Sequence, residues 1–279
     1  MLRVPIAPAP GGNAPAGIHA RAAYLIEGNG TERWSKDADT RRPMASITKV
    51  MTAMVVIRSG DLNRTITIKR KYLTYGARHG ATVAGLRPGD RFTARQLLYA
   101  LLLPSGADAA YALADSYGPG WRGFVGKMNT TAHTLGMGHT TYDNFDGLPW
   151  PTAFADSTTP RDLARLAQYA MKSPTFRSVA GKAAYTLPKS GRHRRYRWTN
   201  TNRLLGVYRG TRGIKTGFTN AAGYCLLFSA TRGRRTLYGV ALGNVSSANR
   251  FTDAAHMLDW GFNAKTPSAL RLADVPVTD

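Results

Sequence analysis

The sequence has little of two reactive residue types: one cysteine, Cys225, and two glutamates, Glu27 and Glu32, among 279 residues. A single cysteine excludes an internal disulfide and any zinc site built on several thiolates. The closest pair of histidines, His133 and His139, is six residues apart, outside the usual spacings of metal ligands. We therefore expect no metal or other cofactor, and we interpret Cys225 as a small buried side chain in a strand.

The sequence also lacks a long hydrophobic run. The longest are Val50–Ile57, which contains a threonine, and Leu97–Leu103, both far below the roughly 18 residues that a transmembrane helix requires. We expect no membrane span, and 43% hydrophobic residues are typical of a soluble globular protein. Residues 1–17 are rich in proline, alanine and glycine and lack the apolar core of an export signal. The protein is then either cytosolic or begins after a removed export signal.

Acidic residues are scarce as well, because 38 lysines and arginines stand against 16 acidic residues, a net charge of +22. A field of this sign favours nucleic acid, anionic lipid headgroups or an anionic cell-wall polymer as a partner. The densest basic cluster, residues 192–198, includes Tyr196 and Trp198 and could stack on RNA bases, but no helix-turn-helix or RNP motif accompanies it. We favour a solvated hairpin at this cluster and do not expect nucleic acid as the partner.

Strand patterns stand at both ends of the chain. Near the N-terminus, His19–Glu27 and Thr31–Lys36 predict two strands joined by a tight turn, because the Gly-Asn-Gly between them tolerates positive φ. Near the C-terminus, alternating hydrophobic residues predict three more strands: Gly213–Thr219, Gly223–Thr231 and Arg235–Asn244.

The middle of the chain, from residue 61 to about 177, is mostly helical in pattern. Pro43 opens the first predicted helix, Met44–Arg58, and Ser247–Phe262 is the last, with apolar residues at three- and four-residue spacing. The helices expected between them are Thr93–Leu103, Asp108–Tyr117, Trp121–Leu135 and Pro160–Met171.

These elements predict an α/β (α+β) fold, in which an antiparallel five-stranded sheet assembled from both ends of the chain is flanked by helices and joined by an all-helical lobe. The expected boundaries are a flexible lead at 1–17, one folded unit at 18–264 and a tail at 265–279, with a sheet lobe at about 18–60 and 181–264 and a helical lobe at about 61–180. The cleft between two lobes is the default position for a functional site.

Ser46 and Lys49 lie at the start of the first strong helical pattern. A spacing of three places the hydroxyl and the amine side by side, about 5 to 6 Å apart at Cβ, so an unprotonated lysine could accept the serine proton. The N–H groups at a helix start suit a developing oxyanion. Chance alone gives roughly 0.5 such spacings in this composition, so the pair does not decide the function by itself.

Two further segments carry polar groups that fit the same chemistry. Lys215–Gly217 lies in a predicted strand, where glycine lets another backbone approach and an extended peptide could add as a strand. A second lysine near Lys49 would disfavour its charged form. Ser105 precedes a predicted helix, where it either relays a proton between Lys49 and a leaving amine or serves as a simple helix cap.

The order and spacing of these three motifs resemble the serine D-alanyl-D-alanine peptidases of the low-molecular-mass penicillin-binding proteins, peptidase family S11. The wider S-x-x-K, S-x-N, K-T-G superfamily includes the class A β-lactamases. The likeness covers about residues 18–264 and includes the stretches 43–53, 144–148, 157–167 and 215–223. It implies a β-lactamase/transpeptidase-like fold and export to the outer face of the cytoplasmic membrane.

The resemblance also implies catalytic roles. Ser46 would attack the penultimate D-Ala carbonyl of a peptidoglycan stem peptide, expel D-Ala and form an acyl-enzyme. Lys49 would be the base for that step, and Ser105 with Lys215 would relay the proton. β-Lactams would acylate Ser46 and act as inhibitors.

The substrate-binding residues implied by the resemblance lie mainly on the third motif. The N–H groups of Ser46 and Phe218 would form the oxyanion hole. Thr216 and Arg250 would hold the terminal carboxylate, a charge-assisted contact that suits the fork of an arginine. Lys215 and Gly217 would complete the edge on which the peptide lies.

The second motif departs from the family pattern. It usually ends in asparagine, whose amide orients the lysine and the acyl chain, and Ala107 occupies that position here. A literal Ser247–Asn249 triplet follows the third motif instead, and we interpret it as a helix cap. Losing the amide removes one or two hydrogen bonds, about 1 to 3 kcal/mol if they reach the transition state, so we expect slow or shifted activity rather than none.

Two alternatives to a DD-peptidase remain. A class A-like β-lactamase needs a glutamate-activated water supplied from between the second and third motifs, and both glutamates of this chain precede Ser46. A catalytically weak, basic cell-wall-binding module would keep the fold and lose turnover. The sequence leaves open whether water or an amino group accepts the acyl chain, which separates a carboxypeptidase from a transpeptidase.

Overall fold

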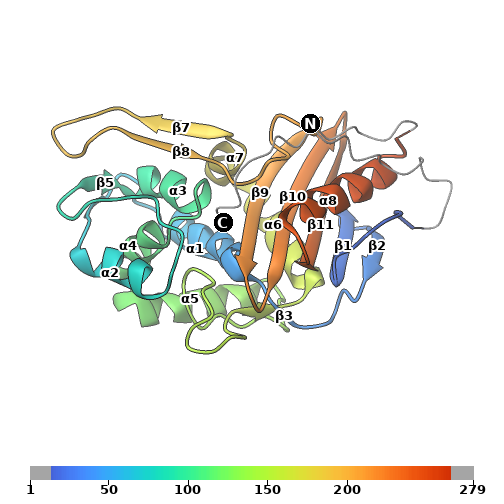
Figure 1. Ribbon diagram of the computed structural model, residues 1–279, viewed down its shortest axis with the longest axis horizontal. Coiled ribbons are helices and arrows are strands. Elements are labelled where there is room, and N and C mark those ends of the chain that lie inside the picture. The colour runs from blue at the N-terminus through green and yellow to red at the C-terminus, as the bar shows by residue number, and fades with distance from the viewer. Residues whose placement is uncertain (1–13, 265–279) are drawn as a thin grey trace.

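The structure, a computed structural model, describes residues 14–264, so the predicted tail at 265–279 and residues 1–13 of the predicted lead lie outside it. Its centre is an antiparallel sheet of five strands in the order β2-β1-β11-β10-β9 (Figure 1). These strands are β1 (Ala22–Glu27), β2 (Glu32–Lys36), β9 (Thr211–Thr219), β10 (Gly223–Arg232) and β11 (Arg235–Asn244). Two strands from the N-terminal end pair with three from the C-terminal end, which confirms the predicted fold class.

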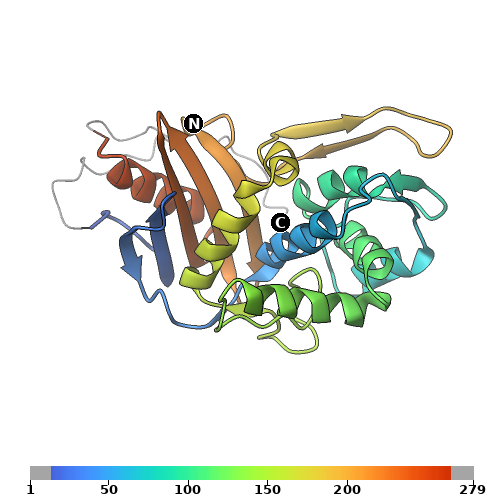
Figure 2. The ribbon, with the colours of Figure 1, turned by 180° about the vertical axis from the view of Figure 1, so that it is seen from behind.

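The two faces of the sheet are covered by helices from different parts of the chain. α8 (Ser247–Gly261) covers one face and α6 (Pro160–Lys172) the other, as Figures 1 and 2 show from opposite sides. Side chains of β10 alternate between the two cores, because successive strand residues point to opposite faces: Leu226 and Phe228 pack on the α8 side and Cys225 on the α6 side. Cys225 is fully buried in a strand, as predicted.

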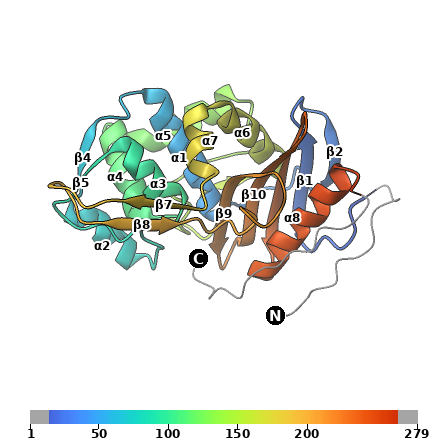
Figure 3. The same cartoon turned by 90° about the horizontal axis from the view of Figure 1, so that it is seen from above.

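α1 (Thr48–Ser59) is the central helix of the part beside the sheet (Figure 3). Every residue from Thr48 to Val56 is buried, because α1 contacts α3, α4, α5, α6 and α7. The helices around it are α2 (Arg70–Arg78), α3 (Ala94–Leu102), α4 (Ala107–Tyr117), α5 (Gly120–Thr134) and α7 (Pro174–Ala180). Among residues 14–264, no helix combines the length and the hydrophobicity needed to cross a bilayer.

Contacts in space cross the lobe boundaries that we predict at residues 60 and 181. α1, from the range of the sheet lobe, packs among the helices, whereas α6 contacts β1 and β11 and α7 contacts β9. The helix that contains Lys49 therefore bridges the two parts of the molecule.

The first predicted helix is wrong at its start. The proline expected to open it belongs to the short strand β3 (Arg42–Pro43), and a 3-10 turn, η1 (Ala45–Ile47), precedes α1. Ala45 has a φ of +49°, far from the φ of about −63° of a regular α-helix. Ser46 therefore lies on a tight turn before the helix, and the prediction of Met44–Arg58 as one helix needs this correction.

Three short strand pairs of the described chain lie outside the main sheet, and the sequence prediction anticipates only the hairpin of the third pair. They are β3 with β6 (Ser157–Thr158), β4 (Thr65–Thr67) with β5 (Arg91–Thr93), and β7 (Ala184–Leu187) with β8 (Tyr196–Thr199). Each strand is only two to four residues long, too short for a periodic pattern to identify.

The basic cluster at 192–198 lies in the β7–β8 hairpin, as predicted. The hairpin runs alongside α3, where the rings of Tyr99 and Tyr185 stack with centroids 3.8 Å apart (Figures 1 and 3). Tyr196 and Trp198 are 4% and 3% exposed. These two rings are therefore part of the core and do not offer a surface on which bases could stack.

Candidate active site

A cleft of about 220 Å³ lies where the end of β9 meets the start of α1. Its lining residues are Ser46, Lys49, His79, Gly80, Ala81, Thr82, Ser105, Leu148, Pro149, Thr216, Gly217, Phe218, Thr219 and Asn220. Six of the eight site residues predicted from the sequence are among them; Lys215 and Arg250 are not. Within residues 14–264, no group of three or more His, Cys, Asp or Glu side chains is placed to hold a metal ion.

Ser46 Oγ and Lys49 Nζ lie 3.0 Å apart, so the candidate nucleophile and its candidate base are in hydrogen-bond contact. Lys49 is 1% exposed and also donates to Asp146 O at 2.7 Å. Burial lowers the pKa of Lys49, and three nearby carboxyls, first that of Asp146, oppose this without cancelling it. The amine is therefore biased toward its neutral form, which can take a proton from Ser46.

The loop at 144–150 holds Asp146 O in place. The Asn144 side chain accepts the N–H groups of Asp146 at 3.0 Å and Gly147 at 2.7 Å, and its amide donates to two carbonyls further along the loop. One asparagine thus closes the loop on itself. The sequence analysis gives Asn144 no role, although the Asn-Phe-Asp-Gly pattern is a turn signal that points to it.

Two glycines bring backbone against the turn that carries Ser46. A Cβ at Gly147, where φ is +86°, would lie 1.9 Å from Ala45 O. A Cβ at Gly217 would lie 2.9 Å from Met44 O and 3.1 Å from Ser46 N. The turn is held between the 144–150 loop on one side and β9 on the other, and the close backbone approach predicted for Gly217 is confirmed.

Two buried carboxyls lie near Lys49. Burial raises the pKa of Asp146, against the lowering effect of the lysine, and the Tyr75 hydroxyl donates to Asp146 Oδ1 at 3.2 Å. Burial also raises the pKa of Asp156 to about 7, although its Oδ1 accepts the N–H groups of residues 143 and 144. Burial away from water disfavours charged groups, so this site favours the neutral forms of both the amine and the carboxyls.

Ser105 lines the cleft with an unusual backbone. Its φ is +68°, in the left-handed region that costs a non-glycine residue of order 1–3 kcal/mol. Its Oγ is buried and has no hydrogen-bond partner within the described chain. The residue that caps α4 is Gly106, so the alternative that Ser105 is a simple helix cap is wrong. A strained residue with an unpaired hydroxyl is suited to a ligand that completes the hydrogen bond.

The β9 residues of the third motif divide between the cleft and the core. Thr216 lines the cleft, and its hydroxyl pairs with that of Thr201 at 2.5 Å. Lys215 is fully buried, and its Nζ donates to Thr216 O at 2.9 Å. β9 is the last strand of the described sheet, so its outer edge faces the cleft. An edge of this kind can accept an extended peptide as a further strand.

Arg250 lies outside the described cleft lining. It is 1% exposed on α8, and it donates to Gly217 O at 3.3 Å and to Ser247 Oγ at 3.0 Å. Its contact is therefore with the backbone of β9. The Ser247–Asn249 triplet does begin a helix, as expected, but the capping side chain is Ser246, one residue earlier, which accepts from Asn249 N at 3.1 Å.

Ala107 offers the site no amide. It is 1% exposed, and its N–H donates to Thr82 O at 2.8 Å, which joins α4 to the cleft wall. Asp146 O supplies a hydrogen-bond acceptor for the lysine of the first motif. The sequence analysis gives the neighbouring Asp108 no role. Its carboxyl accepts the N–H groups of Ala84 and Leu86 and so holds the segment that follows the cleft-lining residues 79–82.

Comparison with known proteins assigns the chain to a family. A family model described as D-alanyl-D-alanine carboxypeptidase, peptidase S11, matches residues 10–246. The chain belongs to this family of serine peptidases. Among its relatives, the D-alanyl-D-alanine carboxypeptidase of Streptomyces sp. strain K15 is 45% identical over 258 residues, which are 88% of each chain. The S11 assignment made from the three motifs is confirmed.

Solved structures of S11 peptidases have the same fold. The Streptomyces K15 DD-transpeptidase superposes with a TM-score of 0.85 at 44% identity, over 89% of this chain and 99% of the other. The D-alanyl-D-alanine carboxypeptidase of Mycobacterium tuberculosis H37Rv superposes with a TM-score of 0.81 at 30% identity, over 97% and 99%. The DD-peptidase fold expected from the sequence is thereby confirmed over nearly the whole chain.

Proposed function

We propose that this chain is a serine DD-peptidase that cleaves D-Ala-D-Ala ends of peptidoglycan stem peptides through an acyl-Ser46 intermediate. The observation that carries the proposal is the contact of Ser46 Oγ with the buried amine of Lys49, beside the free edge of β9. Membership of the D-alanyl-D-alanine carboxypeptidase family names the substrate class.

Acylation begins with the neutral Lys49 amine. As Ser46 Oγ attacks the carbonyl carbon of the penultimate D-Ala, its proton passes to Lys49 Nζ. The N–H groups of Ser46 and Phe218 stabilise the oxyanion. When the tetrahedral intermediate collapses, the C–N bond breaks and the departing D-Ala amine takes a proton relayed through Ser105, with Lys215 in support. The product is an ester between the peptide and Ser46.

The edge of β9 positions the substrate. The stem peptide lies along it as an added strand, with Thr216, Gly217 and Phe218 beside the scissile bond. The terminal carboxylate lies near the Thr216 hydroxyl. We propose that Arg250 acts as a positioning residue, because it holds the carbonyl of Gly217 from behind the strand.

Release of D-Ala from a D-Ala-D-Ala peptide tests the proposal. Wild type should release D-Ala and Ser46→Ala should not. The matched control is Ser35→Ala, because this exposed serine lies on β2, at the opposite edge of the sheet. Equal rates for Ser46→Ala and wild type would leave only the alternative of a cell-wall-binding module.

Penicillins separate the proposal from a β-lactamase. The two carboxyls that act most strongly on Lys49 in the described chain, Asp146 and Asp156, are fully buried, and burial raises the pKa of both, which disfavours the carboxylate form that would activate a water. We therefore expect a penicilloyl adduct that persists in intact-mass spectra. An adduct that is lost within seconds supports the β-lactamase instead.

We further propose that the protein works outside the cytoplasmic membrane, where its net charge of +22 attracts an anionic cell-wall polymer. Binding to purified wall should then weaken steeply as salt rises, and binding that survives high salt contradicts the charge argument. Product analysis with a diamino acid present decides the acceptor. Free peptide identifies a carboxypeptidase, and a peptide joined to the amine identifies a transpeptidase.

A further inference from the structure

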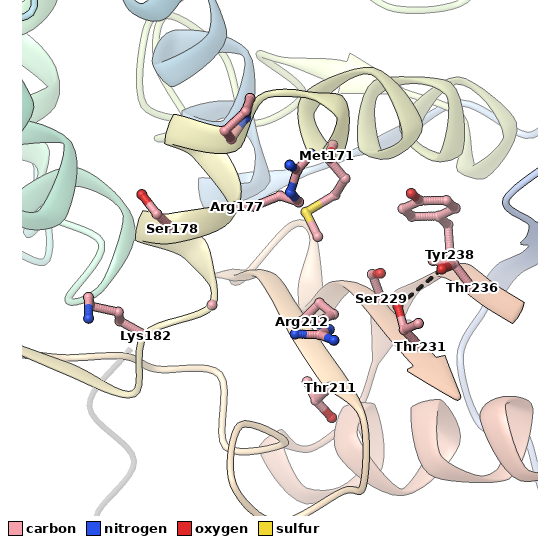
Figure 4. A pocket seen from close by; sticks show the side chains of 12 residues that line it. Met171, Arg177, Ser178, Lys182, Thr211, Arg212, Ser229, Thr231, Thr236 and Tyr238 are labelled. Atoms are coloured by element: carbon pink, nitrogen blue, oxygen red, sulfur yellow. Dashed lines mark hydrogen bonds between the residues drawn. The ribbon is translucent and has the colours of Figure 1, made fainter. Parts of the chain in front are cut away.

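A second and larger pocket lies away from the catalytic cleft. Its volume is about 750 Å³, within the range of small-molecule sites, and none of its described lining residues lines the catalytic cleft. Figure 4 shows it between α7 and the α6-facing side of the sheet. Its lining residues are Met171, Pro174, Arg177, Ser178, Gly181, Lys182, Thr211, Arg212, Ser229, Thr231, Thr236 and Tyr238.

The charged residues of this pocket are all basic. Arg177, Lys182 and Arg212 line it, and none of its described lining residues is acidic. Arg212 forms no ion pair or side-chain hydrogen bond within residues 14–264, and neither does Lys182. Arg177 is exposed and uses only Nη1, which donates to two carbonyls at the end of α6, so its Nε and Nη2 make no hydrogen bond within residues 14–264. Positive charge gathered without a counter-charge favours an anionic ligand.

The floor of the pocket contains an unpaired hydroxyl. Ser229 is fully buried on β10, and its Oγ has no hydrogen-bond partner within the described chain. In the sheet register it lies between Gly213 on β9 and Tyr238 on β11. A buried donor without a partner costs stability, so one is uncommon in a native fold without a ligand or a water to pair it.

The donors of the pocket come from four different elements. Figure 4 shows the guanidinium groups of Arg177 on α7 and Arg212 on β9, with Ser229 on β10 and Tyr238 on β11 along the sheet beside them. Burial raises the pKa of Tyr238, which keeps its hydroxyl a donor at neutral pH. Lys182 lies farther out in the same view.

We propose that this pocket binds a phosphate group, carried by a free phosphate ester or by the phosphodiester backbone of an anionic polymer. A tetrahedral phosphate presents oxygens in several directions and can pair with two arginine forks and the two hydroxyls together. A planar carboxylate is satisfied by a single fork, so it would leave the other donors unpaired. The site does not depend on the peptidase activity, because it shares no described lining residue with the cleft.

Phosphate binding is tested on the full chain by calorimetry and by thermal unfolding. The probes are inorganic phosphate, glycerol phosphate and a short poly(glycerol phosphate), with acetate as the carboxylate control at equal ionic strength. For wild type, the phosphate probes should bind saturably and raise the Tm, and acetate should not. Ser46→Ala should bind them as wild type does, which separates this pocket from the proposed peptidase site.

Two variants remove single donors from the pocket. Arg212→Gln and Ser229→Ala should each weaken phosphate binding about tenfold, the expected effect of losing one hydrogen bond to a charged group. Without phosphate, Ser229→Ala should unfold at or above the wild-type Tm, because it removes a buried unpaired hydroxyl. Arg70→Gln is the matched control: Arg70 is exposed at the start of α2, far from the pocket, and should bind as wild type does.

The relative affinities of the phosphate probes identify the kind of phosphate that the pocket binds. If the polymer binds as tightly as glycerol phosphate, the pocket takes a chain phosphodiester, and if only the small esters bind, it takes a free phosphate ester. The proposal is overturned if wild type binds no phosphate probe. It is equally overturned if Arg212→Gln and Ser229→Ala both bind like wild type, or if acetate binds as well as phosphate.

Discussion

At the scale of single residues, burial decides what the first motif can do. The spacing of Ser46 and Lys49 predicts their contact, because residues three apart are neighbours on a helical turn. The partner that holds the lysine, Asp146 O, comes from 97 residues further along the chain, and no local pattern predicts such a contact. The sequence therefore identifies the reacting pair but not the group that orients it or the burial that lowers the pKa of Lys49.

The pH dependence of acylation tests the role of Lys49. The base must be unprotonated, so the rate of penicillin acylation should rise with pH, with a midpoint below 10.5, the ordinary pKa of a lysine. Lys49→Arg carries a guanidinium that stays protonated and should acylate about 10²–10⁴-fold more slowly at every pH. Stopped-flow single-turnover kinetics measures both, with Lys189→Arg, an exposed lysine, as the control. A flat wild-type profile would argue against the lysine as base.

Two variants of Ser105 separate the effect of its strained backbone from the effect of its hydroxyl. Ser105→Gly and Ser105→Ala both remove Oγ, so both should lose acylation to a similar extent. Glycine tolerates the φ of +68° that alanine does not, so Ser105→Gly should be the more stable of the two by about 1 kcal/mol. Urea unfolding beside acylation kinetics checks this. Full activity in either variant removes Ser105 from the proton relay.

At the scale of elements, the sequence predicts the regular structure well and the connections poorly. β11 is found at Arg235–Asn244 as predicted, and α8 ends one residue before the predicted Phe262. Ala45, in the turn before α1, and Ser105, two residues before α4, both have a positive φ that local preference opposes. Packing against distant segments sets these conformations. The sequence pattern therefore predicts which residues form the site but not the backbone conformation that shapes it.

The 144–150 loop should tolerate no side chain at Gly147. An alanine there would place Cβ 1.9 Å from Ala45 O at a φ of +86°, so Gly147→Ala should lower the free energy of unfolding by more than about 2 kcal/mol and slow acylation, because the loop carries Asp146 O. Gly138→Ala is the control, since nothing lies within 4 Å of its built Cβ. Equal stability of the two variants in urea would contradict the packing described for this loop.

At the scale of the whole molecule, a strongly basic protein buries six of the acidic residues in its described part: Asp108, Asp146, Asp156, Asp162, Asp253 and Asp259. Burial raises the pKa of Asp108, Asp146 and Asp156. The composition gives the net charge but does not show where the acidic side chains lie in the fold. The three carboxyls with a raised pKa interact with Lys49, and their neutral forms allow that amine to be neutral as well.

Asp156 should make stability depend on pH. In the unfolded chain its pKa is near 3.8, and in the fold it is about 7, so between these values only the unfolded state releases the proton. The free energy of unfolding of wild type, measured against Asp156→Asn, should therefore fall as pH rises from about 4 to 7, by up to about 4 kcal/mol, and level off above. Urea titrations across this range measure it. A constant difference between the two proteins would mean that Asp156 titrates normally.

The central claim is that the Ser46 hydroxyl is the nucleophile activated in this cleft. The most direct test is peptide-mapping mass spectrometry after a brief exposure of the protein to benzylpenicillin at neutral pH. The account predicts one penicilloyl group, attached to the peptide that contains Ser46, and none in Ser46→Ala. An adduct on any other side chain, or one that survives in Ser46→Ala, would contradict it.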